Sequence, residues 1–227
     1  MMYKNISDNF KQITENIQKA KEKSGREDQV RIMAVTKTIN AERINAAISC
    51  GVDLLGENRV QEFLQKIPEY SDCEIHFIGG LQTNKVKQII TQNRKINMIH
   101  SVDRVKLAQE INKQVSLRGD LMDILIEVNI GGEESKNGVI PEAVFELAKQ
   151  IDEEFPFLRL RGLMTIPPVV GESVKHFKKM QRLFEDLKAE VSTADTLSMG
   201  MSGDYAVAVE YGATIIRVGT ALFGNRI

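Results

Sequence analysis

The sequence lacks the features that mark several protein classes. Its 227 residues include only two cysteines, Cys50 and Cys73, which make neither a disulfide framework nor a metal-binding pattern. The formal net charge is −1, so no basic excess favours nucleic acid or an anionic membrane as a partner. No apolar run approaches the roughly 18 residues that a membrane span needs, and the N-terminal segment has no apolar stretch typical of a secretory signal. These absences predict a cytoplasmic protein that binds neither nucleic acid nor membrane and keeps both cysteines reduced.

The chain does contain a repeated alternation of short apolar segments and longer amphipathic segments. A helix is predicted over residues 4–23, where apolar residues recur at helical spacing until Ser24 and Gly25 end the pattern. Eight candidate strands follow, at residues 30–38, 52–58, 74–80, 96–102, 122–130, 158–166, 196–200 and 214–219. A helical pattern follows each of the first seven. Asn40 and Asp103 are predicted to cap two of these helices, Pro141 to begin another, and the longest to cover residues 172–191.

This alternation predicts the fold class. Several strands are continuously apolar, which is typical of parallel strands whose outer side is covered by helices. Eight strand–helix units predict an α/β protein with one domain, residues 1–227, folded as a (β/α)8 TIM-type barrel with an extra N-terminal helix. The alternative is an open doubly wound sheet. The first strand–helix turn, residues 36–42, lacks the glycine-rich dinucleotide fingerprint of such sheets, which favours the closed barrel.

The loops after strands 7 and 8, the common phosphate site of such barrels, carry small and hydroxyl residues. These residues are Ser198, Gly200, Ser202, Gly203, Gly219 and Thr220. Small residues let backbone N–H groups approach a phosphate, and hydroxyl groups add further donors. Tight turns alone use the same residue types, so the two interpretations stand about equal here.

Lys37 and Arg217 add a more specific indication. Lys37 ends an apolar strand, where burial favours a neutral amine that attacks an aldehyde, although a lysine reaching solvent at the barrel rim is about twice as common. Arg217 lies two residues before Gly219, so both point to the same side of the last strand. A lysine Schiff base, a phosphate cup and an arginine facing a pyridine nitrogen together are typical of a pyridoxal 5′-phosphate (PLP) site. Beside a permanent cation the pyridine nitrogen stays unprotonated, which makes the cofactor a weak electron sink and unsuited to transamination.

Seven segments resemble the pyridoxal phosphate homeostasis protein family, whose barrel is similar to the barrel domain of alanine racemase and ornithine decarboxylase (fold type III). They are AVTKT (34–38), GENRVQE (56–62), HFIGGLQTNK (76–85), VN with the following E and K.G (128–138), RGLMTIPP (161–168), LSMGMSGD (197–204) and IRVGTALFG (216–224). They span most of the chain, and as a set they are highly specific. The resemblance implies a set of PLP-binding residues: Lys37 for the Schiff base, Ser198 or Ser202 with Gly219 and Thr220 for the phosphate, Arg217 at the pyridine nitrogen, and Asn58 and Met164 as pocket lining.

The resemblance also implies a function, in which the protein keeps reactive free PLP in check and supplies it to PLP-requiring apo-enzymes without established turnover. Racemases of this fold complete their site with a second, β-rich domain. Residues 221–227 are too few to encode one, which favours a monomer and argues against efficient racemisation. A low-activity PLP-dependent racemase or lyase is the alternative, with Tyr205 or Tyr211 as the candidate second acid–base group. A barrel that acts as a scaffold without a cofactor is a third possibility.

For His76, His100, Lys136 and Glu57 we favour structural roles over functional ones. His76 and His100 lie in two predicted strands, and we expect packed, hydrogen-bonded histidines rather than metal ligands at about four to one. Lys136 matches the family pattern and could accept PLP transiently, but we favour a solvated side chain. Glu57 is expected to pair locally with Arg59.

Overall fold

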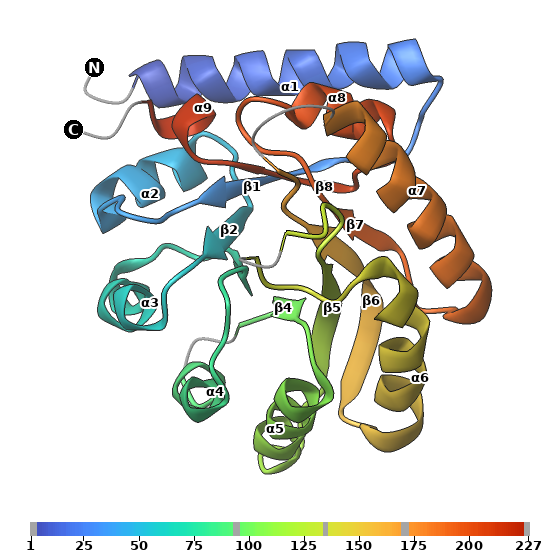
Figure 1. Ribbon diagram of the computed structural model, residues 1–227. Coiled ribbons are helices and arrows are strands. Elements are labelled where there is room, and N and C mark those ends of the chain that lie inside the picture. The colour runs from blue at the N-terminus through green and yellow to red at the C-terminus, as the bar shows by residue number, and fades with distance from the viewer. Residues whose placement is uncertain (1–3, 93–95, 134–135, 169–172, 225–227) are drawn as a thin grey trace.

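The computed structural model describes residues 4–92, 96–133, 136–168 and 173–224 (Figure 1). Its parallel strands form a closed barrel in sequence order, in which the last strand pairs with the first. The strands are β1 (Arg31–Val35), β2 (Leu54–Glu57), β3 (Glu74–Phe77), β4 (Met98–Val102), β5 (Met122–Val128), β6 (Leu158–Thr165), β7 (Thr196–Ser198) and β8 (Ile215–Val218). The predicted barrel is therefore confirmed and the open sheet is wrong. Most strands end one to three residues earlier than predicted, because the chain leaves the sheet there to form the barrel mouth.

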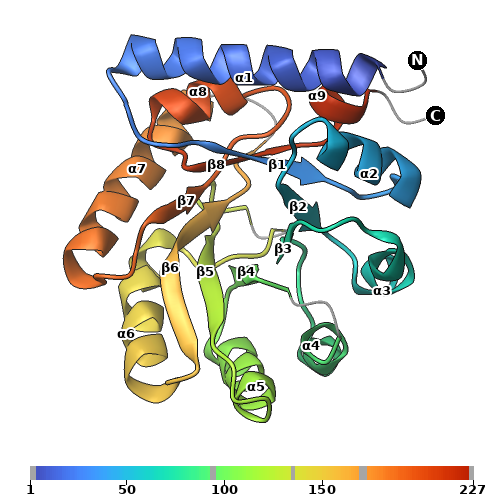
Figure 2. The same ribbon diagram turned by 180° about the vertical axis from the view of Figure 1, so that it is seen from behind.

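Helices surround the sheet on its outer side (Figures 1 and 2). They are α1 (Lys4–Ser24), α2 (Ala41–Ser49), α3 (Val60–Lys66), α4 (Thr83–Ile90), α5 (Val105–Ser116), α6 (Val144–Glu154), α7 (Ser173–Glu190), α8 (Tyr205–Glu210) and α9 (Thr220–Phe223), with 3-10 turns η1 (Ile67–Glu69) and η2 (Pro141–Ala143). Asn40 caps α2 as predicted, since its side chain accepts a hydrogen bond from Arg43 N at 3.0 Å. Pro141 opens the 3-10 turn η2 ahead of α6. The predicted cap at Asp103 is wrong: the N-cap of α5 is Arg104, and the Asp103 carboxylate pairs with the Arg104 guanidinium.

The main apolar core lies between the sheet and the helices. The face of α7 formed by Phe177, Met180, Phe184 and Leu187 is buried there, as its spacing predicts. Each such side chain stabilises the fold by roughly 1.5–3 kcal/mol when it leaves water. Among the described residues, no helix combines the length and the apolar character that a membrane crossing requires.

The N-terminal helix α1 crosses the outside of the barrel over α8 and α9 (Figure 1). The amide of Asn9 donates to Leu222 O of α9 at 2.9 Å, and that of Asn16 donates to the Tyr205 hydroxyl of α8 at 2.8 Å. The helices α8 and α9 directly follow the loops after β7 and β8. By packing on both helices, α1 supports the two candidate phosphate loops from outside the barrel.

The interior of the barrel contains two small apolar clusters and a group of buried polar side chains. One small apolar cluster contains Met33, Leu54, Ile78 and Ile215, and a second contains Met98, Leu125 and Met164. Buried polar side chains occupy the space that these clusters leave: His76, His100, Ser198 and Arg217. The interior therefore departs from the uniformly apolar filling that stability alone would favour.

Candidate functional site

The loop after β1 holds Lys37 between firmly bonded neighbours. Thr36 donates to Gly56 O through both its N–H and its hydroxyl, at 3.2 and 3.1 Å. The Lys66 ammonium donates to Thr36 O at 2.9 Å and to Ile39 O at 3.1 Å. Thr38, which adopts a left-handed φ of 64°, donates its N–H to the Glu62 carboxylate at 2.5 Å. A left-handed non-glycine residue costs about 1–2 kcal/mol, so the strain beside Lys37 is maintained by these contacts.

Lys37 itself is half-buried, directly beyond the end of β1. Its side-chain ammonium makes no hydrogen bond or ion pair with any described residue. A lysine in a rigid loop at the barrel mouth, with a free amine, suits nucleophilic chemistry better than packing.

Arg217 and Ser198 are brought together inside the barrel. The buried Arg217 guanidinium donates to the Ser198 hydroxyl at 2.8 Å and to Thr165 O on β6 at 2.7 Å. Burial lowers the pKa of Arg217 to about 10, although the Glu127 and Asp204 carboxylates oppose the shift. The guanidinium therefore stays charged at neutral pH. A fixed cation lies inside the barrel, near the end of β8.

Glu127, near the end of β5, is a site residue to which the sequence assigns no role. Its carboxyl is buried, and its Oε2 has no hydrogen-bond partner among the described residues. Burial and the nearby Asp103 carboxylate raise the pKa of Glu127 to about 7, while Arg217 opposes the shift. Its position at a strand end was visible in the sequence, but its burial and its proximity to Arg217 depend on the closed barrel.

The loops after β7 and β8 meet through Ser202. The Ser202 hydroxyl accepts a hydrogen bond from Ala221 N in the first turn of α9, at 3.1 Å. Gly219 is the N-cap of α9, and Thr220 is exposed at its start. Gly200 has φ of 90°, and a Cβ there would lie 2.5 Å from the Cβ of Ala208. Only glycine therefore lets this loop approach α8 so closely.

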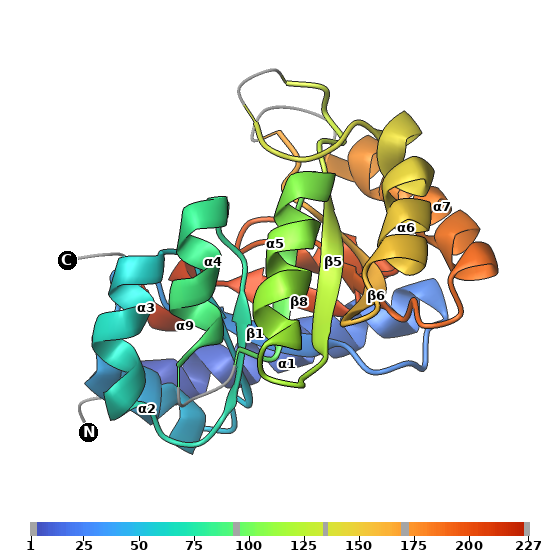
Figure 3. The same cartoon turned by 90° about the horizontal axis from the view of Figure 1, so that it is seen from below.

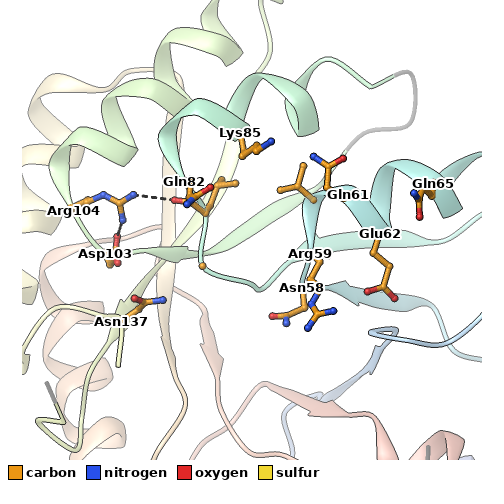
Figure 4. A pocket seen from close by; sticks show the side chains of 13 residues that line it. Asn58, Arg59, Gln61, Glu62, Gln65, Gln82, Lys85, Asp103, Arg104 and Asn137 are labelled. Atoms are coloured by element: carbon orange, nitrogen blue, oxygen red, sulfur yellow. Dashed lines mark hydrogen bonds and ion pairs between the residues drawn. The ribbon is translucent and has the colours of Figure 1, made fainter. Parts of the chain in front are cut away.

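A cavity of about 830 Å³ opens at the same mouth of the barrel (Figure 4). Its side chains come from the residues after β2, β3 and β4, and from Asn137 in the loop between β5 and η2, which extends away from the barrel (Figure 3). Asn58 lines the cavity, whereas the other predicted site residues do not. Glu62 also lines it, and this carboxylate accepts from Thr38 N, so the cavity wall reaches the residue next to Lys37.

Met164 lies deeper. It is fully buried and packs with Met98 and Leu125 inside the barrel. Strand register aligns it with Glu127 on β5 and with Ser198 on β7. It therefore belongs to the layer of side chains that contains Glu127 and Ser198.

The predicted hydrogen-bonded histidines are confirmed, whereas the predicted Glu57–Arg59 pair is wrong. His76 and His100 are buried and bonded to each other, at 2.8 Å between His76 Nδ1 and His100 Nε2. Glu57 is buried on the outer side of the sheet and accepts from the Tyr70 hydroxyl instead of pairing with Arg59. Lys136 is partly exposed, with 30% of its side chain accessible, and pairs with Glu133 at 2.7 Å.

Tyr205, a candidate acid–base group for the racemase alternative, is buried in the helix layer. Its hydroxyl accepts from Asn16 of α1. Tyr211, the second candidate, is partly buried against the same outer core.

The arrangement can be compared with known proteins. Residues 9–226 match the alanine racemase N-terminal domain family. The chain is 45% identical over 229 residues to the pyridoxal phosphate homeostasis protein of Aquifex aeolicus, covering 98% of this chain and 99% of that protein. It is 37% identical over 230 residues to the protein of the same name from Escherichia coli K12, covering 97% of each. The chain belongs to the pyridoxal phosphate homeostasis protein family.

Several solved structures share the barrel. A protein of unknown function from Bifidobacterium adolescentis is 34% identical with a TM-score of 0.90, over 97% of this chain and 95% of that one. PipY of Synechococcus elongatus with PLP bound is 28% identical with a TM-score of 0.80, over 96% of this chain and 100% of PipY. Alanine racemase of Clostridium difficile shares the fold, at 17% identity and a TM-score of 0.75. The match spans 96% of this chain and 57% of the racemase.

The residues at the mouth fit a phosphorylated aldehyde such as PLP. The Lys37 amine is free of described partners, and the Ser202 loop and the start of α9 offer hydroxyl and N–H donors. A guanidinium and an orphaned carboxyl oxygen, from Arg217 and Glu127, are buried beside that mouth. An unpaired buried polar group costs stability, so the Glu127 oxygen favours a ligand site at this mouth.

Proposed function

We propose that this chain binds PLP as a Schiff base on Lys37 and serves in PLP homeostasis, releasing the cofactor to PLP-requiring apo-enzymes rather than turning over a substrate. The observation that carries the proposal is the Lys37 amine, which lacks a described partner yet sits in a loop that Thr36, Thr38 and Lys66 hold rigidly. When bound, PLP supplies an aldehyde that a lysine amine can hold reversibly.

The phosphate is assigned to Ser202, Gly219 and Thr220. Ser202 lies half-buried on the loop and already accepts from the first turn of α9, so its own hydroxyl proton is free to donate to a phosphate oxygen. The start of α9 adds N–H groups that favour an anion. Ser198 is fully buried below this loop and bonded to Arg217, so we choose Ser202 over Ser198 for the phosphate.

Arg217 is assigned to the pyridine nitrogen, with Asn58 and Met164 as residues that would line the pocket. A guanidinium holds no lone pair and stays charged, so it donates to an unprotonated ring nitrogen and disfavours the pyridinium. That choice weakens carbanion chemistry and supports storage over turnover.

A carrier role is favoured over the racemase alternative by two findings. Several relatives that match along nearly their whole length carry the name of homeostasis proteins. In addition, the Tyr205 hydroxyl accepts a hydrogen bond from Asn16 of α1 in the helix layer outside the barrel. We expect the carrier to act as a cytoplasmic monomer.

The proposal is tested by loading the protein with PLP, removing free PLP, and adding a PLP-requiring apo-enzyme. We expect the apo-enzyme to regain activity, faster than the loaded carrier alone loses PLP to buffer. The same preparation, incubated with L-alanine and other amino acids, is expected to yield no racemised or cleaved product above a Lys37→Ala control. Sustained Lys37-dependent turnover without activation of the apo-enzyme would instead establish the enzyme alternative.

A further inference from the structure

A continuous chain of hydrogen bonds crosses the interior of the barrel. Arg217 on β8 donates to Ser198 on β7, and the Ser198 hydroxyl lies 3.1 Å from His100 Nδ1 on β4. His100 Nε2 lies 2.8 Å from His76 Nδ1 on β3, and His76 Nε2 lies 2.7 Å from the Glu74 carboxylate. Strands β3 and β4 lie across the barrel from β7 and β8 (Figure 2), so the chain joins opposite walls.

The chemistry of the groups fixes the direction of each bond. The Glu74 carboxylate accepts from Arg31 at 2.7 Å, so it must also accept from His76, which places a proton on His76 Nε2. With both rings neutral, His76 Nδ1 is then an acceptor, so His100 carries its proton on Nε2. His100 Nδ1 is left as the acceptor for the Ser198 hydroxyl proton, and the oxygen of Ser198 accepts from Arg217.

The charged surroundings agree with this assignment. The groups that face the two rings are Glu74 on β3, Arg31 on β1, Asp123 on β5 and Arg217 on β8. Burial lowers the pKa of His76, and burial together with His76 and Arg217 lowers the pKa of His100 well below its usual range. The hydrogen bond from His76 holds the pKa of Glu74 at about 2, so this group remains a carboxylate.

We propose that His100, held in one tautomer by His76 and Glu74, is a positioning residue that orients the Ser198 hydroxyl and, through it, the Arg217 guanidinium at the cofactor site. Ser198 has a single proton, and this arrangement commits it to His100, which leaves the serine oxygen as an acceptor for Arg217. Thr165 O fixes a second nitrogen of the same guanidinium. These bonds hold the cation in one orientation, and among the described residues no carboxylate forms an ion pair with it.

We expect the stability of the protein without PLP to depend on pH through these two histidines. As the pH falls below about 6.5, the unfolded chain protonates its histidines while the folded chain keeps His76 and His100 neutral. The unfolded state then binds more protons, so the free energy of unfolding decreases as the pH falls through that range.

The first test uses the apo-protein and long-range 1H–15N spectra of its histidine rings, with His176→Gln used to assign the third histidine. We expect both buried rings to be protonated on Nε2 and unprotonated on Nδ1, and to stay neutral at about pH 6, below the ordinary histidine pKa. A charged His100, or a proton on its Nδ1, would overturn the proposal.

The second test measures PLP affinity and rests on the proposed function. His100→Leu removes the acceptor of Ser198 and is expected to raise the Kd for PLP about 10-fold or more, as for a lost hydrogen bond to a charged group. His100→Gln offers Ser198 a carbonyl oxygen and His76 an N–H group, so it is expected to keep an affinity close to wild type. Met98→Leu changes a neighbouring interior side chain outside the chain of hydrogen bonds and is the matched control.

The outcomes separate the two proposals. Equal PLP affinity in wild type, His100→Leu and Met98→Leu overturns the positioning role, and so does a His100→Gln variant as weak as His100→Leu. If wild type itself fails to bind PLP, the proposed function fails, and the ring spectra alone decide whether the directed hydrogen-bond chain exists.

Discussion

The two mouths of the barrel differ in which charged side chains lack a partner. At the N-terminal mouth, Arg31 pairs with Glu74, and Arg161 pairs with both Asp123 and Asp195. At the C-terminal mouth, Lys37 has no described partner and Glu127 keeps an unpaired buried oxygen. The unpaired buried oxygen of Glu127 costs stability unless a ligand satisfies it. This difference favours the site that we propose at the C-terminal mouth.

The largest difference between the mouths is expected from their glycines. Gly200→Ala, at the C-terminal mouth, places a Cβ 2.5 Å from Ala208 and 3.0 Å from the Tyr205 backbone, at a φ of 90°. We expect it to lower the free energy of unfolding by about 2–4 kcal/mol and to weaken PLP binding. Gly212→Ala, on the opposite side, has a φ of 97° but no neighbour closer than 3.7 Å, so only backbone strain of about 1–2 kcal/mol is expected. Urea unfolding measures both, and equal losses would show that the phosphate loop is not tightly packed.

Glu127→Gln tests the buried carboxyl at the C-terminal mouth through the pH dependence of the free energy of unfolding. In the apo-protein the pKa of Glu127 is about 7 instead of 4.5, so the folded state holds this proton more tightly than the unfolded state. Its contribution to the free energy of unfolding is present at low pH and is lost as the pH rises from about 4.5 to about 7, by on the order of 3 kcal/mol. We expect Glu127→Gln to abolish that loss, seen as a difference between the two stability curves.

The exposed Glu146→Gln on α6 controls for the change in net charge. Parallel curves for wild type and Glu127→Gln would contradict the buried, protonated carboxyl.

Ser202→Ala tests whether the C-terminal mouth holds a phosphate. The variant removes one hydroxyl donor to a charged oxygen, so the Kd for PLP is expected to rise about 10- to 100-fold. Ser101→Ala is the control, because that hydroxyl is buried on β4 and has no partner among the described residues. Equilibrium titration followed by absorbance measures both, and an unchanged affinity in Ser202→Ala would move the phosphate elsewhere.

The smallest effect is expected at the N-terminal mouth. Asp195→Asn removes one exposed partner of Arg161, which keeps Asp123. The free energy of unfolding is expected to fall by no more than about 1 kcal/mol, with no change in PLP affinity. A loss of PLP affinity in this variant would break the division between a structural and a functional mouth.

Much of this division follows from the sequence, because the barrel places strand ends together wherever the alternation predicts strands. Lys37, Ser202 and Arg217 were identified in this way, and the structure has all three at or near the ends of β1, β7 and β8. The bonds from Arg217 through Ser198 to His100 were not predictable, since they depend on which side chains meet across the closed barrel. Local signals also failed where a nearby side chain competed: Asp103 pairs with Arg104 instead of capping α5, and Glu57 turns outward to Tyr70.

The central claim is that Lys37 carries PLP at the C-terminal mouth. The most direct measurement is borohydride reduction of the PLP-loaded protein, followed by proteolysis and mass spectrometry of the peptides. We predict one reduced adduct, on the peptide that contains Lys37, and its loss in Lys37→Ala while that variant keeps its circular dichroism spectrum. A principal adduct on another lysine, or no adduct at saturating PLP, would contradict the account.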